Sequence, residues 1–423
     1  MKLDVRSTNF DIRCTNIRPD KLMMNRLKYF LGCLIFSFFC LVLAAQNLPA
    51  GDNLSALGKL VGDKDAIVVA DPGGRIIYEK NAGKKLIPAS TLKLLTSLAA
   101  LHYLGPEYRF ATEFYMDKDS NLKVKGYGDP LLLSEVLIEI SKTLGSRVKH
   151  INDLVLDDSY FKPATIPGVT SSLEPYDSPN GALCANFNTV NFDILKGKPV
   201  SAEPQTPLLP FALKKINKSS IKAGRILLSS EQNENTLYAG HLLSHFLEKE
   251  GIKPKGKIIV GPVRQETDRL ILKYLSPFSI EDIISRLLLH SNNFIANQIV
   301  LAISAKISGQ PGTLDKGVLA ISDFAVNNLK IDDLTIVEGS GISRENRISA
   351  KSFLKILAAF EPHLDLMKHN GNEYYKTGTL SGISTRAGYI KGRDGRLYKF
   401  IIMTNSNGNY AEKISRKLCG LIE

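Results

Sequence analysis

The sequence has few cysteines, and their placement excludes several classes of protein. Five cysteines occur in 423 residues, and Cys14, Cys33 and Cys40 lie within the first 45. The other two, Cys184 and Cys419, are too widely separated to give a disulfide framework or a zinc-ligand spacing. A single bridge between these two remains an alternative.

Nucleotide-binding and metal-binding patterns are also missing. No phosphate-binding loop, no dinucleotide glycine fingerprint and no internal repeat occurs. His241 and His245 are four residues apart on an expected helix, but no third ligand lies near them in the sequence. We therefore expect these histidines to have a surface or packing role, and we expect neither a metal nor a cofactor.

The basic surplus and the N-terminal segment are present and informative. A formal net charge of +12 suits an anionic partner such as cell wall, membrane surface or nucleic acid, although an evenly solvated surface explains it equally well. Arg26 and Lys28 precede an apolar run, residues 29–45, that ends in small residues. This order is typical of a secretory signal, which predicts a periplasmic protein cleaved near Ala44 or Ala45. An uncleaved inner-membrane anchor is the alternative, because about 17 apolar residues lie at the lower limit for spanning a bilayer.

Along the remaining chain, the expected type of secondary structure changes twice. Residues 65–81 predict a β-hairpin, and residues 90–104 predict a buried helix that is apolar nearly all round and is bracketed by Pro88 and Gly105-Pro106. Short strands then alternate with turns from residue 108, with one helical piece at 241–250. Helices return beyond residue 276, followed by three strands and a terminal helix at 410–422, which could lie on a membrane but is expected to pack on the sheet.

The first of three chemical motifs is Ser90-Thr91-Leu92-Lys93. Residues three apart on a helix share a face, so Lys93 can lie beside the Ser90 hydroxyl. A serine hydroxyl needs a base to become a nucleophile, and a lysine amine can be that base if burial and the charge of Lys376 lower its pKa. A plain helix N-cap is the alternative for Ser90. The same pattern recurs at other serines, but only Ser90 opens an apolar, bracketed helix.

The other two motifs are Ser291-Asn292-Asn293 and Lys376-Thr377-Gly378. Ser291 and Asn293 lie between two expected helices, where they could link Lys93 to a substrate or simply cap a helix. The Lys-Thr-Gly motif lies in an expected strand, and its glycine permits another backbone to approach closely.

An extended peptide could pair with this strand and place the Thr379 amide near the reacting carbonyl. A plain surface strand with an exposed lysine is the alternative.

In this order the motifs resemble those of the penicillin-recognising serine hydrolases. The arrangement resembles the D-alanyl-D-alanine carboxypeptidase/endopeptidases of the penicillin-binding protein four type. Matching segments include IPASTLKLLTSLAALHYLGPEYRFAT, GYGDPLL, SPNGALCANFN and EGSGISRENRIS. About 200 residues separate the first two motifs, an interval longer than in related β-lactamases and simpler carboxypeptidases.

The resemblance implies an α+β fold. A β-lactamase/transpeptidase-like domain, an antiparallel sheet with helices on both sides, would carry a large β-rich insert. Residues 1–45 would be the N-terminal extension and signal peptide, 46–107 plus 268–423 the discontinuous catalytic domain, and 108–267 the insert, with a reduced third subdomain around 190–250.

The resemblance also implies roles for individual residues. Ser90 would form the acyl-enzyme, Lys93 would be the general base, and Ser291 and Asn293 would relay protons and hold the substrate amide. Further residues would bind the substrate: Lys376 and Thr377 at its terminal carboxylate, Thr379 in the oxyanion hole with the Ser90 amide, and Arg344 and Tyr176 around the stem-peptide side chain. Gly378 of the same motif would also belong to the substrate-binding residues.

The implied partners are peptidoglycan stem peptides and β-lactam antibiotics as covalent inhibitors, with no nucleic acid and with peripheral membrane association as an option. Two departures concern specificity: Glu338 stands where relatives have Asp, and Glu174 is a candidate for the acidic pocket residue by position alone. A serine β-lactamase-like hydrolase and a catalytically silent wall-binding scaffold remain alternatives.

Overall fold

The computed structural model describes residues 54–170, 172–406 and 410–422. The predicted signal peptide or anchor, residues 1–45, therefore lies outside the described residues. Within the described ranges, no helix combines the length and the apolar character needed to cross a bilayer.

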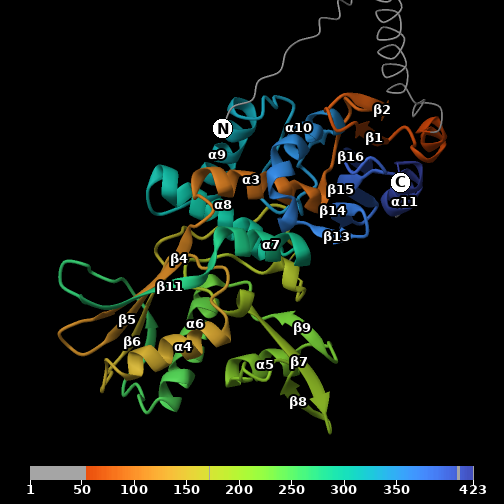
Figure 1. Ribbon diagram of the computed structural model, residues 1–423. Coiled ribbons are helices and arrows are strands. Elements are labelled where there is room, and N and C mark those ends of the chain that lie inside the picture. Colours follow the sequence, from red (N-terminus) through yellow and green to blue (C-terminus); the bar gives the residue numbers. More distant parts are fainter. Residues whose placement is uncertain (1–53, 171, 407–409, 423) are drawn as a thin grey trace, which may run out of the picture. The chain divides into compact units, whose positions relative to one another are not determined.

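Strands from both ends of the chain form one six-stranded sheet (Figure 1). Its order is β13-β14-β15-β16-β1-β2, and every neighbouring pair is antiparallel. The strands are β1 (Asp65–Ala70), β2 (Ile76–Lys80), β13 (Lys368–Asn370), β14 (Glu373–Leu380), β15 (Ile383–Lys391) and β16 (Leu397–Thr404). The predicted hairpin at 65–81 is thus β1-β2. Its first strand pairs with β16, so strands from the two ends of the chain lie side by side in this sheet.

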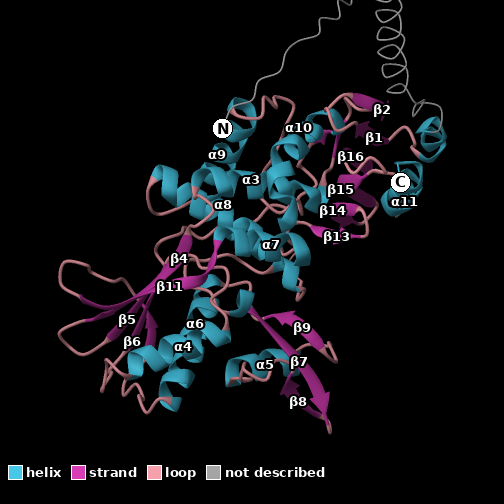
Figure 2. Ribbon diagram, viewed as in Figure 1, coloured by secondary structure: helices cyan, strands magenta, loops and turns pink. Residues whose placement is uncertain are grey.

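The two faces of this sheet bury different helices, because side chains alternate along a strand. In β1, Ala66 and Val68 face the large core, whereas Ile67 and Val69 face a smaller one on the other side. The large core is covered by α3 (Lys93–Tyr103), α7 (Ile280–His290), α8 (Asn293–Ser308), α9 (Leu314–Asn327) and α10 (Ala350–Phe360). The smaller one is covered by η1 (Ser55–Leu60) and α11 (Tyr410–Ile422). Figure 2 shows this layering, which confirms the predicted fold class.

The predicted helix at 90–104 begins as a tight 3-10 turn, η2 (Ala89–Leu92), and continues as α3. Residues 91–100 are all buried. This explains why the helix is apolar nearly all round, since α7, α8, α9 and α10 each pack against it.

Residues 108–267 hold more helix than the sequence predicted. Four of their strands and the following strand, β11, form a mixed five-stranded sheet, β10-β6-β5-β4-β11, and three more form a second sheet, β8-β7-β9. The strands are β4 (Arg109–Met116), β5 (Leu122–Gly126), β6 (Leu154–Asp157), β7 (Thr189–Leu195), β8 (Lys198–Ser201), β9 (Gly224–Leu227), β10 (Ile258–Val260) and β11 (Arg269–Ser279). The helices are α4 (Ser134–Gly145), α5 (Pro210–Lys218) and α6 (Gln232–Lys249).

The expectation of a single helical piece at 241–250 was therefore wrong. Helix α4 buries Val136, Leu137, Ile140 and Leu144 at helical spacing, but it follows Leu131–Leu133 so closely that the apolar run has no visible start. Helix α6 begins with the polar residues 232–235, which give no apolar periodicity. Tertiary packing, rather than local pattern, sets these boundaries.

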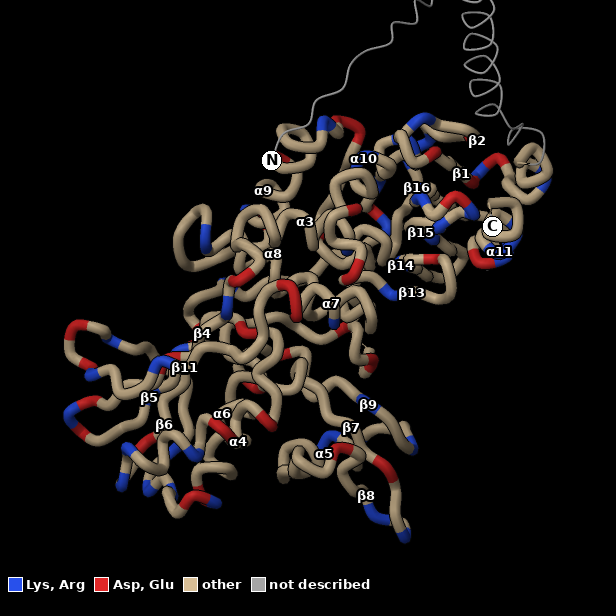
Figure 3. Tube along the Cα trace, in the orientation of Figure 1, with Lys and Arg blue, Asp and Glu red and all other residues tan. Residues whose placement is uncertain are grey.

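Helix α11 packs on the sheet, as expected. Ile414 and Leu418 are fully buried against it, and Leu421 is 37% exposed. Its apolar side is thus occupied within the fold and is not presented to a lipid surface. Figure 3 shows acidic and basic residues interspersed along the described trace, so the charge distribution by itself indicates no particular partner.

A buried ion pair ties β14, β15 and α11 together. Arg386 donates to both carboxylate oxygens of Glu373 at 2.7 and 2.6 Å, Ser415 donates to the same carboxylate at 2.5 Å, and the guanidinium lies 3.6 Å from the ring centroid of Tyr375. Both charged side chains are about one tenth exposed. Removing one partner would leave the other charge buried and uncompensated.

We expect Arg386→Met to lower the free energy of unfolding by about 3 kcal/mol, measured by urea denaturation. Adding Glu373→Gln to this variant should recover part of that loss. Arg396→Met, which breaks the exposed Arg396–Asp394 pair, serves as the control and should leave stability nearly unchanged. Equal losses in the two single variants would contradict the structural role of the buried pair.

Candidate active site

The turn that carries Ser90 is pressed between two glycine-containing segments. Gly341 adopts a φ of +83°, and a Cβ there would lie 1.9 Å from the Ala89 carbonyl oxygen. A Cβ on Gly378 would lie 2.6 Å from the Ser90 amide nitrogen. Glycine at both places therefore lets strand β14 and the 338–343 loop reach the backbone of Ser90.

Lys93 lies at the centre of the site with no exposed surface. Its Nζ donates to Asn293 Oδ1 at 2.8 Å and to the Ser340 carbonyl at 2.7 Å, and it lies within hydrogen-bond distance of Ser90 Oγ, at 2.8 Å. Burial, followed by the positive charge of Lys376, lowers the pKa of Lys93 well below its ordinary value. These shifts favour the neutral amine, the form that can act as a base.

The three partners of this amine also determine its orientation. A neutral amine has two N–H groups and one lone pair, and the oxygen atoms of Asn293 and Ser340 can only accept. They therefore take the two N–H groups and leave the lone pair facing the hydroxyl of Ser90. This geometry suits proton transfer from Ser90 to Lys93.

A second lysine lies beside the first. Lys376 Nζ donates to Ser291 Oγ at 2.7 Å and to the Thr377 carbonyl at 2.8 Å. Burial, with a smaller contribution from Lys368, lowers the pKa of Lys376 to about 7. Ser291 ends α7 in the left-handed region, at a φ of 55°, a conformation that costs energy in a non-glycine residue and is often found at functional sites.

A cleft of about 810 Å³ opens onto these residues. Of the predicted site residues, it is lined by Ser90, Ser291, Asn293, Thr379, Tyr176 and Arg344. Lys93 and Lys376 lie buried behind it. Thr377 and Gly378 do not line it: Thr377 is exposed, and Gly378 is buried against the Ser90 turn. The Arg344 guanidinium donates to the Ser381 carbonyl at the rim.

Two glutamates near the cleft, Glu345 and Glu338, were given no role in the site by the sequence analysis. Glu174, the candidate acidic pocket residue, does not line the cleft, whereas Glu345 does. Glu338 is fully buried behind Lys93 in the loop that supplies the Ser340 carbonyl. Their position in the EGSGISRE segment was visible in the sequence, but the fold decides which way each one faces.

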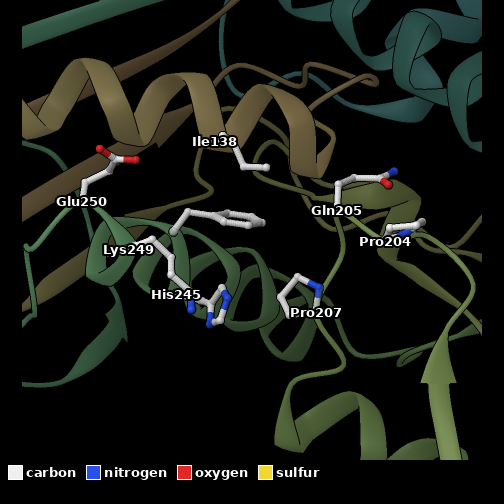
Figure 4. Close-up of a pocket in the computed structure, with 8 residues that line it drawn as sticks. Ile138, Pro204, Gln205, Pro207, His245, Lys249 and Glu250 are labelled. Carbon is white, nitrogen blue, oxygen red and sulfur yellow. The ribbon is translucent and has the colours of Figure 1, made fainter.

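The other candidate features lie outside this cluster. Figure 4 shows a cavity of about 350 Å³ in which His245 and Lys249 of α6 and Ile138 of α4 contribute to the lining. None of the predicted site residues lines it. In the described ranges, no group of three or more His, Cys, Asp or Glu side chains could hold a metal ion. Cys184 is a buried thiol that accepts a hydrogen bond from Asn188 at 3.1 Å, and burial raises its pKa.

The fold and the cluster together define a penicillin-recognising serine hydrolase. A serine on the turn before a buried helix lies at the cleft, and a lysine three residues later and a second lysine on a sheet strand lie buried behind it. Similarity to known proteins identifies the family within this class.

The model of the D-Ala-D-Ala carboxypeptidase 3 (S13) family matches residues 51–225 and 215–369. The chain belongs to this family of serine-type D-alanyl-D-alanine carboxypeptidases. It is 25% identical over 427 residues to a D-alanyl-D-alanine carboxypeptidase of an Actinomadura species, an alignment that covers 82% of this chain and 79% of the relative.

Solved structures show the same fold. Penicillin binding protein 4 (dacB) of Haemophilus influenzae superposes with a TM-score of 0.71 at 20% identity, covering 87% of this chain and 99% of that one. A penicillin G-acylated predatory endopeptidase of Bdellovibrio bacteriovorus, in complex with its immunity protein, superposes with a TM-score of 0.51 at 16% identity, covering 84% and 91%.

We expect Gly378→Ala to slow acylation of the protein by a fluorescent penicillin about 100-fold, the effect of losing one oxyanion donor. The added Cβ would lie 2.6 Å from the Ser90 amide nitrogen, so it would force that amide away from β14. Gly83→Ala is the matched control, because a Cβ there meets nothing within 4 Å. Parental acylation kinetics in Gly378→Ala would show that this close approach is not required.

Proposed function

We propose that this chain is a serine D,D-carboxypeptidase and endopeptidase that hydrolyses D-Ala-D-Ala or D-Ala-diamino acid bonds of peptidoglycan through an acyl-enzyme on Ser90. The supporting observation is the buried amine of Lys93, 2.8 Å from Ser90 Oγ and held by two further acceptors. This arrangement provides a nucleophile and its base in a water-poor setting.

In the acylation step, Lys93 takes the proton of Ser90 while Oγ attacks the carbonyl carbon of the penultimate D-alanine. The negative oxygen that develops is stabilised by the backbone N–H groups of Ser90 and Thr379. Ser90 lies in the turn that leads into α3, where the helix N-terminus adds positive potential.

The leaving amine needs a proton for the C–N bond to break. Ser291 accepts a hydrogen bond from Lys376, so its own hydroxyl proton is available to the departing nitrogen. Asn293 holds Lys93 and can contact the substrate amide from the floor of the cleft. The proton that Lys93 took from Ser90 then replaces the one that Ser291 lost, which restores the neutral amine. In hydrolysis Lys93 accepts a proton from the attacking water and returns it to Ser90 Oγ as the ester bond breaks.

Substrate binding uses the rest of the motif. Lys376 and Thr377 hold the terminal carboxylate, while Arg344 and Tyr176 meet the side chain of the stem peptide. Carboxypeptidase and endopeptidase action differ in what leaves: a terminal D-alanine in the first case and a cross-linked peptide in the second.

The same proposal assigns the parts of the chain. Residues 46–107 plus 268–423 act as the catalytic domain and 108–267 as an inserted domain, with a smaller subdomain at 190–250. Residues 1–45 direct export to the periplasm, which N-terminal sequencing of the mature protein would test.

The direct test is labelling with a fluorescent penicillin, followed over time, in the parent and in Ser90→Ala and Lys93→Ala. We expect stable labelling of the parent and none of Ser90→Ala, and a nearly complete loss in Lys93→Ala because the two residues act as a unit. Release of D-alanine from a D-Ala-D-Ala peptide should follow the same order. Rapid release of the label would indicate a β-lactamase instead, and a parent that is never labelled would indicate a silent scaffold.

The pH dependence of kcat/KM should be bell-shaped. Activity requires neutral Lys93 and charged Lys376, so the rate rises as pH increases through the lowered pKa of Lys93 and falls as Lys376 loses its charge near pH 7. Lys376→Arg should move the alkaline limb upward, because arginine stays charged. An alkaline limb that stays in place in this variant would contradict the assignment to Lys376.

A further inference from the structure

A single buried carboxylate organises the loop behind Lys93. Glu338 has no exposed surface, and its two oxygens accept six hydrogen bonds, three each, from donors that are all uncharged. The donors to Oε2 are Ser340 N and Oγ (both 2.6 Å) and Asn297 Nδ2 (3.4 Å), and those to Oε1 are Gly341 N (2.7 Å), Asn346 Nδ2 (2.7 Å) and Ser343 N (3.3 Å). Such a full shell of donors satisfies both oxygens of the buried carboxylate.

One of these hydrogen bonds acts directly on the environment of Lys93. The Gly341 N–H and the Ser340 carbonyl belong to the same planar peptide group, and in a trans peptide they point in opposite directions. The N–H end is held by Glu338 at 2.7 Å, and the carbonyl end accepts from Lys93 Nζ at 2.7 Å. Because Glu338 fixes the N–H end of this peptide group, the carbonyl end points toward Lys93.

The loop is fixed on its other sides as well. Thr96 of α3 donates to the Gly339 carbonyl at 2.6 Å, and Asn297 accepts from the Gly339 amide at 2.8 Å. Asn297 lies one helical turn after Asn293, the second acceptor of Lys93. Both acceptors that orient the amine are therefore supported by one connected set of hydrogen bonds around Glu338.

We propose that Glu338 is a positioning residue for acylation: its carboxylate fixes the 340–341 peptide so that the Ser340 carbonyl takes one N–H of Lys93 and the lysine lone pair faces Ser90. The inference rests on the proposed function, since it concerns the base of that reaction. Glu338 does not line the cleft, so its effect on the substrate is exerted through Lys93.

The charge of Glu338 gives the proposal a distinctive signature. Among the described residues, the charged side chains that act on Lys93 are Lys376 of β14, which lowers its pKa, and Glu338, which raises it. Removing the negative charge should therefore lower the pKa of Lys93 further. A variant that only loosens the fold would not produce this shift.

The test compares Glu338→Gln with the parent in stopped-flow acylation by a chromogenic β-lactam across pH. Glutamine offers one acceptor oxygen in place of two, so the 340–341 peptide loses its clamp. We expect the plateau rate to fall about 100-fold, as for a misaligned reacting group, and the acid limb to move to lower pH. The KM for a soluble D-Ala-D-Ala peptide should stay within about twofold, because kcat carries a loss confined to the transition state.

Asp158→Asn is the matched control. Asp158 is also a buried carboxylate, and it accepts from the Leu183 amide at 2.6 Å and from Thr236 at 3.0 Å. This variant should lose thermal stability while its acid limb stays in place. Rates are normalised to folded protein measured by circular dichroism, so instability alone cannot imitate the expected result.

Glu338→Asp provides the second measurement and decides alone if Glu338→Gln does not fold. It keeps the charge but is one methylene too short for this loop, so we expect slower acylation with an unmoved acid limb. Parental rates in the folded variants, or an acid limb that moves equally in Asp158→Asn, would overturn the proposal. A parent that is never acylated at Ser90 would instead refute the proposed function, which keeps the two failures distinct.

Discussion

The hydrogen bonds of the Lys93 amine are the contacts on which the rest of the site depends. A lysine with no exposed surface is costly to keep charged, and the nearby Lys376 adds to that cost. Its three partners lie at 2.7–2.8 Å: the oxygens of Asn293 and Ser340 accept its two N–H groups, and its lone pair faces the Ser90 hydroxyl. They come from η2, α8 and the 338–343 loop, so the reactive geometry exists only when these segments are packed together.

Close backbone contact is the second constraint. Gly341 and Gly378 bring a loop and a strand against the Ser90 turn, where any side chain would collide with backbone atoms. Strand β14 reaches that place as part of the six-stranded sheet, in which β1 pairs with β16 from the opposite end of the chain. The cleft is therefore a product of long-range strand pairing.

Much of the fold could be predicted from the sequence. Bracketing by proline and glycine located the buried helix, and strand-like runs located the hairpin and the last three strands, because these signals are local. Helix α4 was missed because the apolar run that leads into it has no visible start and because it packs mainly against α6, far away in the sequence. Helix α5 was also missed. The pairing of Ser90 with Lys93 was predictable because residues three apart share a helix face.

The remaining contacts of the site have no comparable local signal. The Ser340 carbonyl is a backbone group that any residue could provide, and the sequence does not show that Glu345 lines the cleft whereas Glu174 does not. Whether Lys93 is neutral in the resting protein tests the whole account most directly. NMR of the protein with 13C-labelled lysine, with the Lys93 resonance identified by its loss in Lys93→Ala, would report its titration. The account predicts a pKa far below the ordinary lysine value, and a resonance that titrates at or above that value would contradict it.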